Sequence, residues 1–333
     1  MFTVESLQQH PGVVKAFTGL PAGEFWSLVD AVAARWGEEE RARRARPERR
    51  RAIGGGRRSA QPLALRVAVV LTYLRLHVPQ AVVGWLFGTS QAEVSRELRE
   101  VLPALQPCLP CPAVWEPLSA GQALPAESAL TLAQVAGGRV LIDATEQRVA
   151  RSRDDATQRR YYSGKKQAHT LKTQIVTDDD HHILAISAAV PGATHDKPLC
   201  DSLRTLDRLP DGIEADADKG YQGLAAQVEA VAACDVATRA GRRCPRLTAR
   251  TPHKKPRGGE LTDEQRRCNR ELGAIRIRVE HCLGWLKHWA VLATRFRCAH
   301  DRYTPIMRVL CGLVNAQTAC WQAARATPEA YSE

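Results

Sequence analysis

The sequence lacks the features that mark membrane, secreted and disulfide-bonded proteins. It has no run of about 18 apolar residues, which excludes a membrane-spanning helix. Its first residues, Met1 to Glu5, lack a basic start and an apolar stretch, which predicts no secretory signal. Its ten cysteines are scattered over 333 residues. A chain of this length does not need disulfides, so we expect reduced thiols and a cytoplasmic protein.

A zinc site is also poorly supported. Cys108 and Cys111 form the one Cys-x-x-Cys pair, and no second close pair follows at the interval of a zinc ribbon. We therefore favour cysteines that pack or lie in a turn near Pro110, with zinc as the alternative.

An excess of basic residues is the main compositional signal. Lysine and arginine total 47 against 36 acidic residues, for a net charge of +11 and a pI of about 9.4. Such a surface attracts polyanions, with nucleic acid as the first candidate and an anionic membrane as the second. The 44% hydrophobic and 25% charged residues are ordinary for a globular protein. The length allows two domains.

Residues 1–60 are expected to form a basic N-terminal segment. Arginines are dense at 41–46, 49–51 and 57–58, around the glycines 54–56. One interpretation is a solvated loop or helix face, and the other is a partly unstructured segment that contacts phosphates.

The region 61–106 is predicted to be a helix-turn-helix domain. An almost entirely apolar stretch from Leu63 to Leu74 indicates a buried helix. A short helix from Gln80 to Phe87 then ends at Gly88, and Thr89-Ser90 is a typical N-cap for a helix from Gln91 to Leu105. The alternative is an ordinary helical hairpin. The apolar face of that last helix consists of Val94, Leu98, Val101 and Leu105. The polar residues that lie off this face and would contact DNA are Ser95, Arg96 and Arg99.

Residues 107–137 are expected to be a linker with a short helix at 128–135, and residues 138–325 a mixed α/β domain. Strands are predicted at 140–142, 171–176, 183–190 and 213–218, and the second and third form a hairpin about the Asp178–His181 turn. Helices are predicted at 197–206, 225–233 and 262–291, the last with an apolar stripe. Strands followed by alternating helices and strands indicate a mixed sheet. The residues of that stripe are Leu272, Ile275, Val279, Leu283, Leu286 and Ala290.

Three carboxylates are the candidate metal ligands. Asp143 ends an apolar run, Asp218 ends a predicted strand, and Glu280 lies within the long helix. Aligned carboxylates in a basic chain suggest a site that holds Mg²⁺ or Mn²⁺ against a polyanion. Asp216 competes with Asp218, because alternate strand residues face one side, and Glu146 is a spare carboxylate near Asp143.

The long helix carries a functional row beside its apolar stripe. Arg276, Glu280 and Lys287 are four and seven residues apart and project from one side. The alternative is a surface ion pair with a solvated lysine. If the row is functional, Glu280 reaches a metal, and Lys287 meets the adjacent phosphate.

Six sequence blocks, in order, resemble the DDE-type transposases of bacterial insertion sequences, in the insertion-sequence-five group with a DDE superfamily endonuclease domain. The resemblance is strong over residues 138–316 and weaker over 62–105. Many members of neighbouring groups carry tyrosine where this chain has Gly273. The blocks lie at 140–146 (Val-Leu-Ile-Asp-Ala-Thr-Glu), 161–172, 191–196 (Pro-Gly-Ala-Thr-His-Asp), 217–223 (Ala-Asp-Lys-Gly-Tyr-Gln-Gly), 269–270 and 276–287.

The resemblance implies a ribonuclease-H-like catalytic domain behind a helix-turn-helix. It implies a transposase that binds the inverted repeats at its element's ends and cuts and joins DNA with two metal ions held by the DDE carboxylates. It also implies target DNA as a partner, a homo-oligomer on DNA and association with the bacterial nucleoid. The roles of His195 and Asp196 stay open. Candidates for backbone contacts, or else a solvated basic face, are Lys165, Lys166, His169 and Lys172.

Two other functions remain possible from sequence. One is a catalytically silent DNA-binding regulator derived from a transposase, although an intact carboxylate triad argues against it. The other is a metal-dependent endonuclease without strand transfer, although a DNA-reading domain ahead of the catalytic part argues for recognition of element ends.

Overall fold

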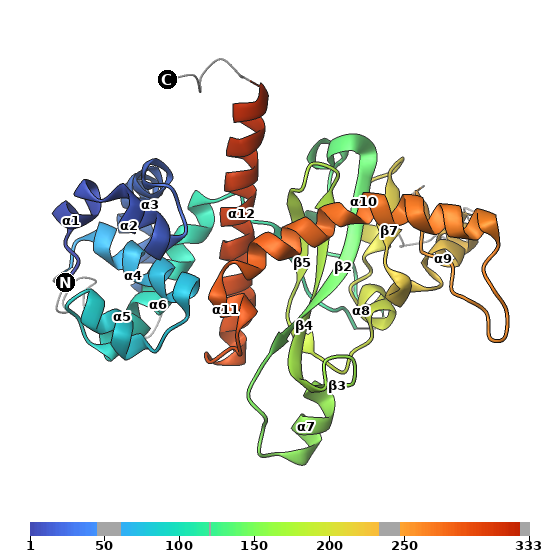
Figure 1. The fold of residues 1–333 in the computed structure, drawn as a ribbon, viewed down its shortest axis with the longest axis horizontal. Coiled ribbons are helices and arrows are strands. Elements are labelled where there is room, and N and C mark those ends of the chain that lie inside the picture. Colours follow the sequence, from blue (N-terminus) through green and yellow to red (C-terminus); the bar gives the residue numbers. More distant parts are fainter. Residues whose placement is uncertain (45–60, 120, 233–246, 327–333) are drawn as a thin grey trace. The chain divides into compact units, whose positions relative to one another are not determined.

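The computed structural model describes residues 1–44, 61–119, 121–232 and 247–326 and contains two compact units (Figure 1). The first comprises Met1–Pro110, Lys287–Thr294 and Pro305–Leu310. The second comprises Cys111–Leu286, Arg295–Thr304 and the chain from Cys311 onward. None of the helices in these described ranges is long and apolar enough to cross a lipid bilayer.

The first unit is helical from its start. Helices α1 to α3 precede the predicted buried helix, so the part of residues 1–60 that the structure describes is folded and belongs to this unit. The arginines at 46, 49–51 and 57–58 lie outside the described residues. Helix α4 is buried on all sides, as its apolar sequence predicted. The helices are α1 (Val4–Gln9), α2 (Pro11–Thr18), α3 (Ala22–Arg44), α4 (Leu63–Leu76), α5 (Gln80–Leu86), α6 (Gln91–Leu105) and α11 (Ala290–Ala293).

The α5–α6 pair has the predicted bounds to within one residue, and the predicted cap. The Ser90 side chain accepts a hydrogen bond from the backbone N–H of Glu93, 3.1 Å away, and α6 begins at the next residue. The turn packs tightly on α5: the Thr89 N–H donates to the Gly84 carbonyl, and a Cβ on Gly84 would stand 2.7 Å from the Thr89 oxygen. Glycine is therefore required there. The apolar face of α6 is buried as predicted.

The second unit is built on a mixed sheet, as the sequence indicated. The strand order is β1-β5-β4-β2-β7-β8, and β3 and β6 also pair with β4. The β2–β4 and β4–β5 pairs are antiparallel, whereas β1–β5, β2–β7 and β7–β8 are parallel. The strands are β1 (Ala113–Trp115), β2 (Arg139–Arg148), β3 (Tyr162–Ser163), β4 (Ala168–Asp178), β5 (Ile183–Ser187), β6 (Val190–Pro191), β7 (Glu214–Ala217) and β8 (Thr248–Arg250).

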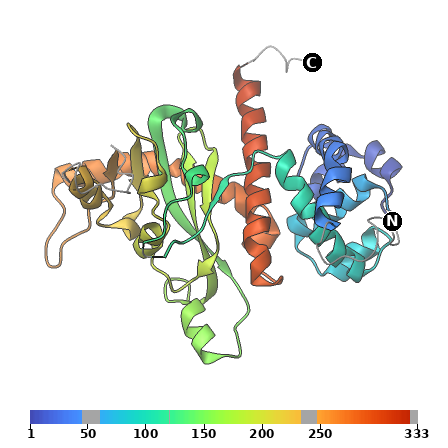
Figure 2. The same ribbon diagram turned by 180° about the vertical axis from the view of Figure 1, so that it is seen from behind.

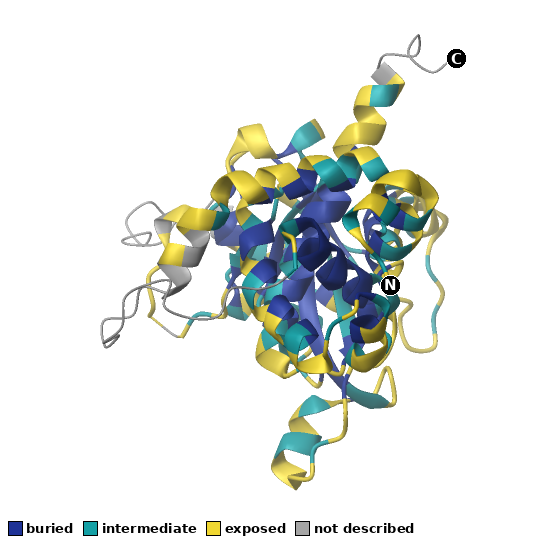
Figure 3. Ribbon diagram, turned by 90° about the vertical axis from the view of Figure 1, so that its left-hand side faces the viewer, coloured by how far each residue is buried: buried dark blue, intermediate teal, exposed yellow. Residues whose placement is uncertain are grey.

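The two faces of the sheet have different covers. Ile142 and Ala217 face a buried core completed by residues of α8 (Asp196–Ser202) and α9 (Leu224–Ala232). The alternate residues of the strands, including Leu141 and Asp143, face the other side of the sheet, on which α10 (Asp263–Lys287) lies. The two opposite views show α10 crossing one side of the sheet (Figures 1 and 2), and Figure 3 shows buried residues along the strands.

Several elements were not expected from the sequence. The predicted linker contains β1, an edge strand of the sheet, and short 3-10 turns at Ala126–Ser128 and Leu132–Gln134 replace its predicted helix. The long helix stops at Lys287, and a further helix, α12 (Tyr303–Ala326), follows. The β2–β4 connection contains a short helix, α7 (Asp155–Tyr161), beyond the end of the sheet (Figures 1 and 2).

The buried stripe of α10 also differs from the prediction. The buried residues are Leu272, Arg276, Val279, Cys282 and Leu286, whereas Ile275 and Leu283 are only half-buried. The stripe therefore includes Arg276, which the sequence placed on its border. This happens because the guanidinium finds two carboxylates under the helix.

Candidate active site

Asp143 and Asp218 are brought together by strand register. Strands β2 and β7 run parallel, and Ile142 lies opposite Ala217. Asp143 follows Ile142 and Asp218 follows Ala217, so the two aspartates lie at the same level of the sheet. The apolar residues before them anchor the strands in the core. Two carboxylates that are far apart in sequence thereby come to one place at the edge of that core.

Arg276 of α10 lies between these two carboxylates. Its Nη2 is 3.1 Å from Oδ2 of Asp143, and its Nη1 is 3.1 Å from Oδ1 of Asp218. The arginine is buried, and its Nε is a buried donor without a partner among the described residues. The sequence predicted a DNA contact for Arg276. In this structure the guanidinium instead links the two aspartates.

The charge on Asp143 is poorly compensated. Burial raises the pKa of the Asp143 carboxyl, and the negative charges of Asp218 and Asp196 raise it further. The N–H of Ala144, 2.7 Å from Oδ1, and the guanidinium of Arg276 oppose this rise in the pKa without cancelling it. The site is therefore short of positive charge.

A second ion-paired group adjoins the first. Lys172 of β4 lies 2.8 Å from Asp196 and 3.6 Å from Glu146, which also accepts a hydrogen bond from the Thr170 hydroxyl. Lys172 is buried, so its ammonium is engaged with carboxylates rather than exposed to DNA. We call Asp143, Asp218, Asp196, Glu146, Arg276 and Lys172 the aspartate site.

Asp196 is the site residue whose role the sequence analysis left open. A Cβ on Gly220 would stand 2.4 Å from Oδ2 of Asp196, so this carboxylate packs against the turn that follows Asp218. The same turn buries Tyr221 completely, and its hydroxyl has no partner among the described residues. Burial raises the pKa of Tyr221 well above its ordinary value. The adjoining His195 is exposed and occupies the N-cap position of α8 without a side-chain hydrogen bond.

The other predicted residues of α10 are exposed. Glu280 lies one turn beyond Arg276, and Lys287 ends the helix. Neither makes a hydrogen bond or ion pair with any residue that the structure describes. Within these described ranges no three His, Cys, Asp or Glu side chains are grouped closely enough to hold a metal ion. The structure thus gathers two of the three predicted carboxylates.

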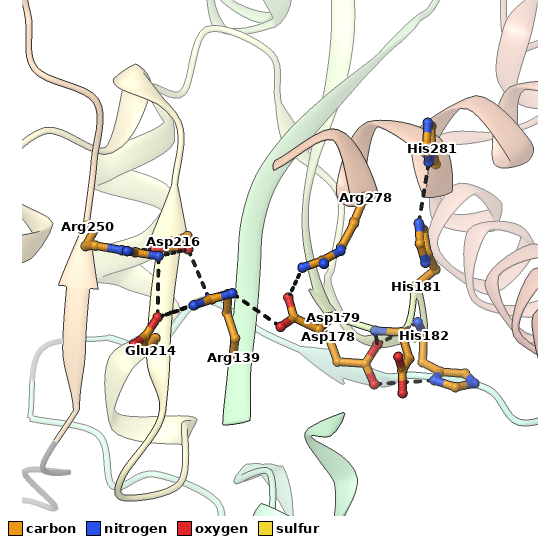
Figure 4. A network of polar contacts seen from close by, with 11 residues as sticks. Arg139, Asp178, Asp179, His181, His182, Glu214, Asp216, Arg250, Arg278 and His281 are labelled. Atoms are coloured by element: carbon orange, nitrogen blue, oxygen red, sulfur yellow. Dashed lines mark hydrogen bonds and ion pairs between the residues drawn. The ribbon is translucent and has the colours of Figure 1, made fainter. Parts of the chain in front are cut away.

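Asp216 belongs to a different network at the start of β2. Its carboxylate receives Nε and Nη2 of Arg250 at 2.8 and 2.7 Å, and Arg139 is 3.4 Å away (Figure 4). Arg139 also bonds Glu214 and Asp179, and Arg278 of α10 bonds Asp179 at 2.6 Å (Figure 4). No local sequence pattern indicated this group of ion pairs. We call it the balanced network: Arg139, Arg250 and Arg278 facing Asp179, Glu214 and Asp216.

The remaining predicted DNA contacts are on exposed or half-exposed positions. Lys165 and Lys166 lie in the exposed turn between β3 and β4, and His169 packs edge-on against Tyr162 with ring centroids 5.6 Å apart. On α6, Arg96 is exposed and paired with Glu93, while the Arg99 Nε donates to the Ser95 carbonyl at 3.3 Å. Ser95 is half-buried.

The two central aspartates fit a magnesium or manganese ion. Mg²⁺ commonly binds through one or two carboxylates together with water and substrate phosphate, so a full protein cage is not needed. The Arg276 guanidinium bridges Asp143 and Asp218, so both carboxylates face one cation between them. Asp143 and Asp218 are the residues that could hold such an ion.

Comparison with known proteins identifies a family model and a relative that this chain resembles. A family model described as a DDE superfamily endonuclease matches residues 142–315, more than half of the chain. A probable transposase for insertion sequence element IS702 from Microchaete diplosiphon is 26% identical over 306 residues, covering 92% of this chain and 94% of that protein. The matched segment includes Asp143, Asp218 and Arg276.

Proposed function

The chain belongs to the DDE superfamily endonucleases, as a DDE-type insertion-sequence transposase, and from this we propose that it binds the ends of its mobile element, cuts the DNA and joins the freed end to a target. One observation carries the proposal. Asp143 and Asp218 converge from neighbouring parallel strands on a single cation position.

The charges around this position support a divalent cation. The aspartate site has four carboxylates against two cations, and burial, together with the negative charges of Asp218 and Asp196, raises the pKa of Asp143. We propose Mg²⁺ or Mn²⁺, with two ions in the complete site. When bound, such ions polarise the phosphodiester and generate the nucleophile from water or a 3′-hydroxyl.

The protein's own groups position the DNA and the two aspartates. Arg276 separates the carboxylates and screens their repulsion, and its planar fork also matches a phosphate oxygen pair. Lys172 holds Asp196 against the turn after Asp218, and this fixes the strand end that carries the second aspartate. We propose that Glu280 completes the carboxylate set when DNA is bound.

Recognition of the element ends is assigned to α5 and α6. Their turn, cap and buried stripe leave Ser95, Arg96 and Arg99 off the apolar face, as a DNA-reading helix requires. Each element has two ends, so we propose that the protein acts as a homo-oligomer on DNA. Arg96→Gln with Arg99→Gln in the full chain should reduce the preference for end DNA over random DNA.

Cleavage and joining of a duplex that carries the element's own inverted repeats test the function. Asp143→Asn should lower cleavage with Mg²⁺ about a thousand-fold or more, because a lost metal ligand removes several kcal/mol of transition-state stabilisation. Asp201→Asn is the matched control, since that carboxylate is exposed and, among the residues that the structure describes, forms its ion pair with Lys197 of α8. Binding without cleavage by the wild-type protein would indicate a silent regulator. Cleavage without joining would indicate a simple endonuclease.

A further inference from the structure

The connection between β2 and β4 is far longer than the sheet needs. Antiparallel neighbours are usually joined by two to five residues, whereas residues 149–167 separate these strands. The segment, here called the arm, contains α7 and β3 and extends past the end of the sheet (Figures 1 and 2). Long connections inside compact domains usually serve a function.

The arm is held in a defined conformation. Asp154 caps α7 by accepting the Thr157 N–H at 2.7 Å, and the carbonyl of Arg160 accepts the Ala193 N–H at 3.1 Å. Tyr162 pairs with His169 in the β3–β4 ladder. Despite these anchors, α7 has no buried residue, and Figure 3 shows it exposed or half-buried. An element that contributes nothing to the core is free to serve as a surface.

Exposed cations dominate that surface. The acids of the arm, Asp154 and Asp155, both sit at the start of α7, where a carboxylate suits the helix dipole. The exposed cations are Arg151, Arg153, Arg159, Arg160, Lys165 and Lys166, and none of them forms an ion pair with a residue in the described ranges.

Some exposed cations elsewhere in the same unit are neutralised by nearby acids. On α10, Arg266 pairs with Asp263 at 2.8 Å and Arg267 pairs with Glu264 at 2.9 Å. Lys255 pairs with Glu260 at 3.0 Å in the loop before α10. The unpaired cations of the arm repel one another in the free protein, and a polyanion removes that repulsion.

The distance from the aspartate site fits duplex DNA. Asp143 is followed by five further residues of β2 before the arm begins, which is about 17 Å at ~3.4 Å per residue. One turn of DNA is about 34–36 Å, so this is about half a turn. Tyr162, exposed beside these cations, is an aromatic residue of the type that nucleic-acid surfaces use.

We propose that the arm binds the phosphodiester backbone of duplex DNA about half a turn from the bond that is cut at the aspartate site. This rests on the proposed function for the identity of the DNA. It adds Arg153, Arg159 and Arg160 as phosphate contacts. These contacts are independent of base sequence and strengthen the hold on the flank of the cleaved bond.

Salt dependence of DNA binding by the full chain in EDTA tests the arm without any metal-dependent step. Fluorescence anisotropy with a labelled duplex would compare wild type with Arg153→Gln/Arg159→Gln/Arg160→Gln. Each lost phosphate contact should reduce the slope of log K against log salt by ~0.9, so the triple variant should lose about 2.7. The matched control is Lys255→Gln/Arg266→Gln/Arg267→Gln, which removes the same charge from paired positions and should keep the wild-type slope. The three single arm variants, each expected to lose ~0.9, serve if the triple variant does not fold.

Equal slopes for wild type and the arm variants, or an equal loss in the control, would overturn the proposal. An unchanged slope on DNA with lost binding to polyglutamate would assign the arm to an acidic protein surface and overturn it as well. Cleavage distinguishes this from the proposed function: at saturating DNA the arm variant should keep its turnover with Mg²⁺, while its KM rises. A wild-type protein that binds with the expected slope but never cuts would refute the catalytic proposal alone.

Discussion

The balanced network and the aspartate site share one sheet and the same kinds of side chain, but their charges differ. Three arginines face three carboxylates at the start of β2, and these groups are joined by contacts of 2.5 to 3.4 Å. Further along the strand, two cations serve four carboxylates. Asp216 and Asp218, two residues apart, belong one to each group.

The pKa shifts follow this difference. Hydrogen bonding to Arg139 lowers the pKa of Glu214 in the balanced network. Burial raises the pKa of Asp143 in the aspartate site, because one shared guanidinium does not compensate it. Paired charges therefore stabilise the fold in the first region, whereas the second keeps an unmet demand for positive charge, as a cation site needs.

The largest expected effect separates the two neighbouring aspartates. Asp216→Asn should lower the free energy of unfolding by about 3 kcal/mol. Asp216 is fully buried, and its replacement removes the charged partner of two arginines, Arg139 and Arg250. Asp218→Asn should change stability by less than ~1 kcal/mol, since that side chain is a third exposed. It should nevertheless lower cleavage about a thousand-fold.

Urea unfolding and a cleavage assay, run on both variants, check this pair. If the Asp218→Asn protein cuts DNA normally and the Asp216→Asn protein is folded but inactive, the catalytic role belongs to Asp216 and the structural role to Asp218. The comparison between the two regions would then fail at its central point.

The second-largest expected effect comes from removing Arg276, which bridges Asp143 and Asp218 in the aspartate site. Arg276→Gln should destabilise the metal-free protein by about 1–3 kcal/mol, because two half-buried carboxylates lose a charged hydrogen-bond donor. Millimolar Mg²⁺ should then raise its Tm more than that of wild type, since an ion bound only by the native state stabilises it.

Arg278→Gln is the matched control for this effect, because Arg278 lies two residues along α10 and pairs with Asp179 in the balanced network. It should lose stability without gaining a response to Mg²⁺. Thermal unfolding with Mg²⁺ and with EDTA measures both. An equal response of the two variants would show that Arg276 does not occupy a cation position.

The sequence predicted local secondary structure better than it predicted which distant residues contact one another. The α6 cap at Ser90 and the β4–β5 hairpin follow from signals within a few residues, and both are present. The meeting of Asp143 with Asp218 needed the β2–β7 register, which no local pattern contains. The sequence predicted a DNA contact for Lys172 and gave no sign of its carboxylate partners, because these come from other segments.

The elements that were missed have weak local signals. Strand β1 has three residues and is stabilised by pairing with β5, so its sequence alone is indistinguishable from a linker. Helix α7 is short and has no buried face, so it lacks the apolar period that predicts helices. The position of Arg276 inside the α10 stripe depends on the carboxylates of Asp143 and Asp218 rather than on helix periodicity.

Lys287 offers a smaller test on the same helix. It ends α10 seven residues beyond Glu280, about 10 Å along the axis at ~1.5 Å per residue, too far to share a metal but close enough to meet the next phosphate. Lys287→Ala should keep first cleavage and reduce strand transfer about ten-fold, because joining needs two DNA segments in register. Lys287→Arg should restore part of the loss. Wild-type rates for both steps in Lys287→Ala would reduce it to a solvated surface lysine.

The smallest effect concerns a histidine beside the balanced network. His182 lies 3.3 Å from Asp178, whose hydrogen bond raises the pKa of the imidazole above its ordinary 6.5. The stability from this pair is fully present below pH 6.5 and is lost as the pH rises through the folded-state pKa. His182→Gln should therefore lose a few tenths of a kcal/mol at acidic pH and match wild type at alkaline pH, since the ring is partly exposed. His253→Gln, at an exposed position, is the control. Urea unfolding across this pH range measures the difference, and a gap between His182→Gln and wild type that widens with pH would contradict it.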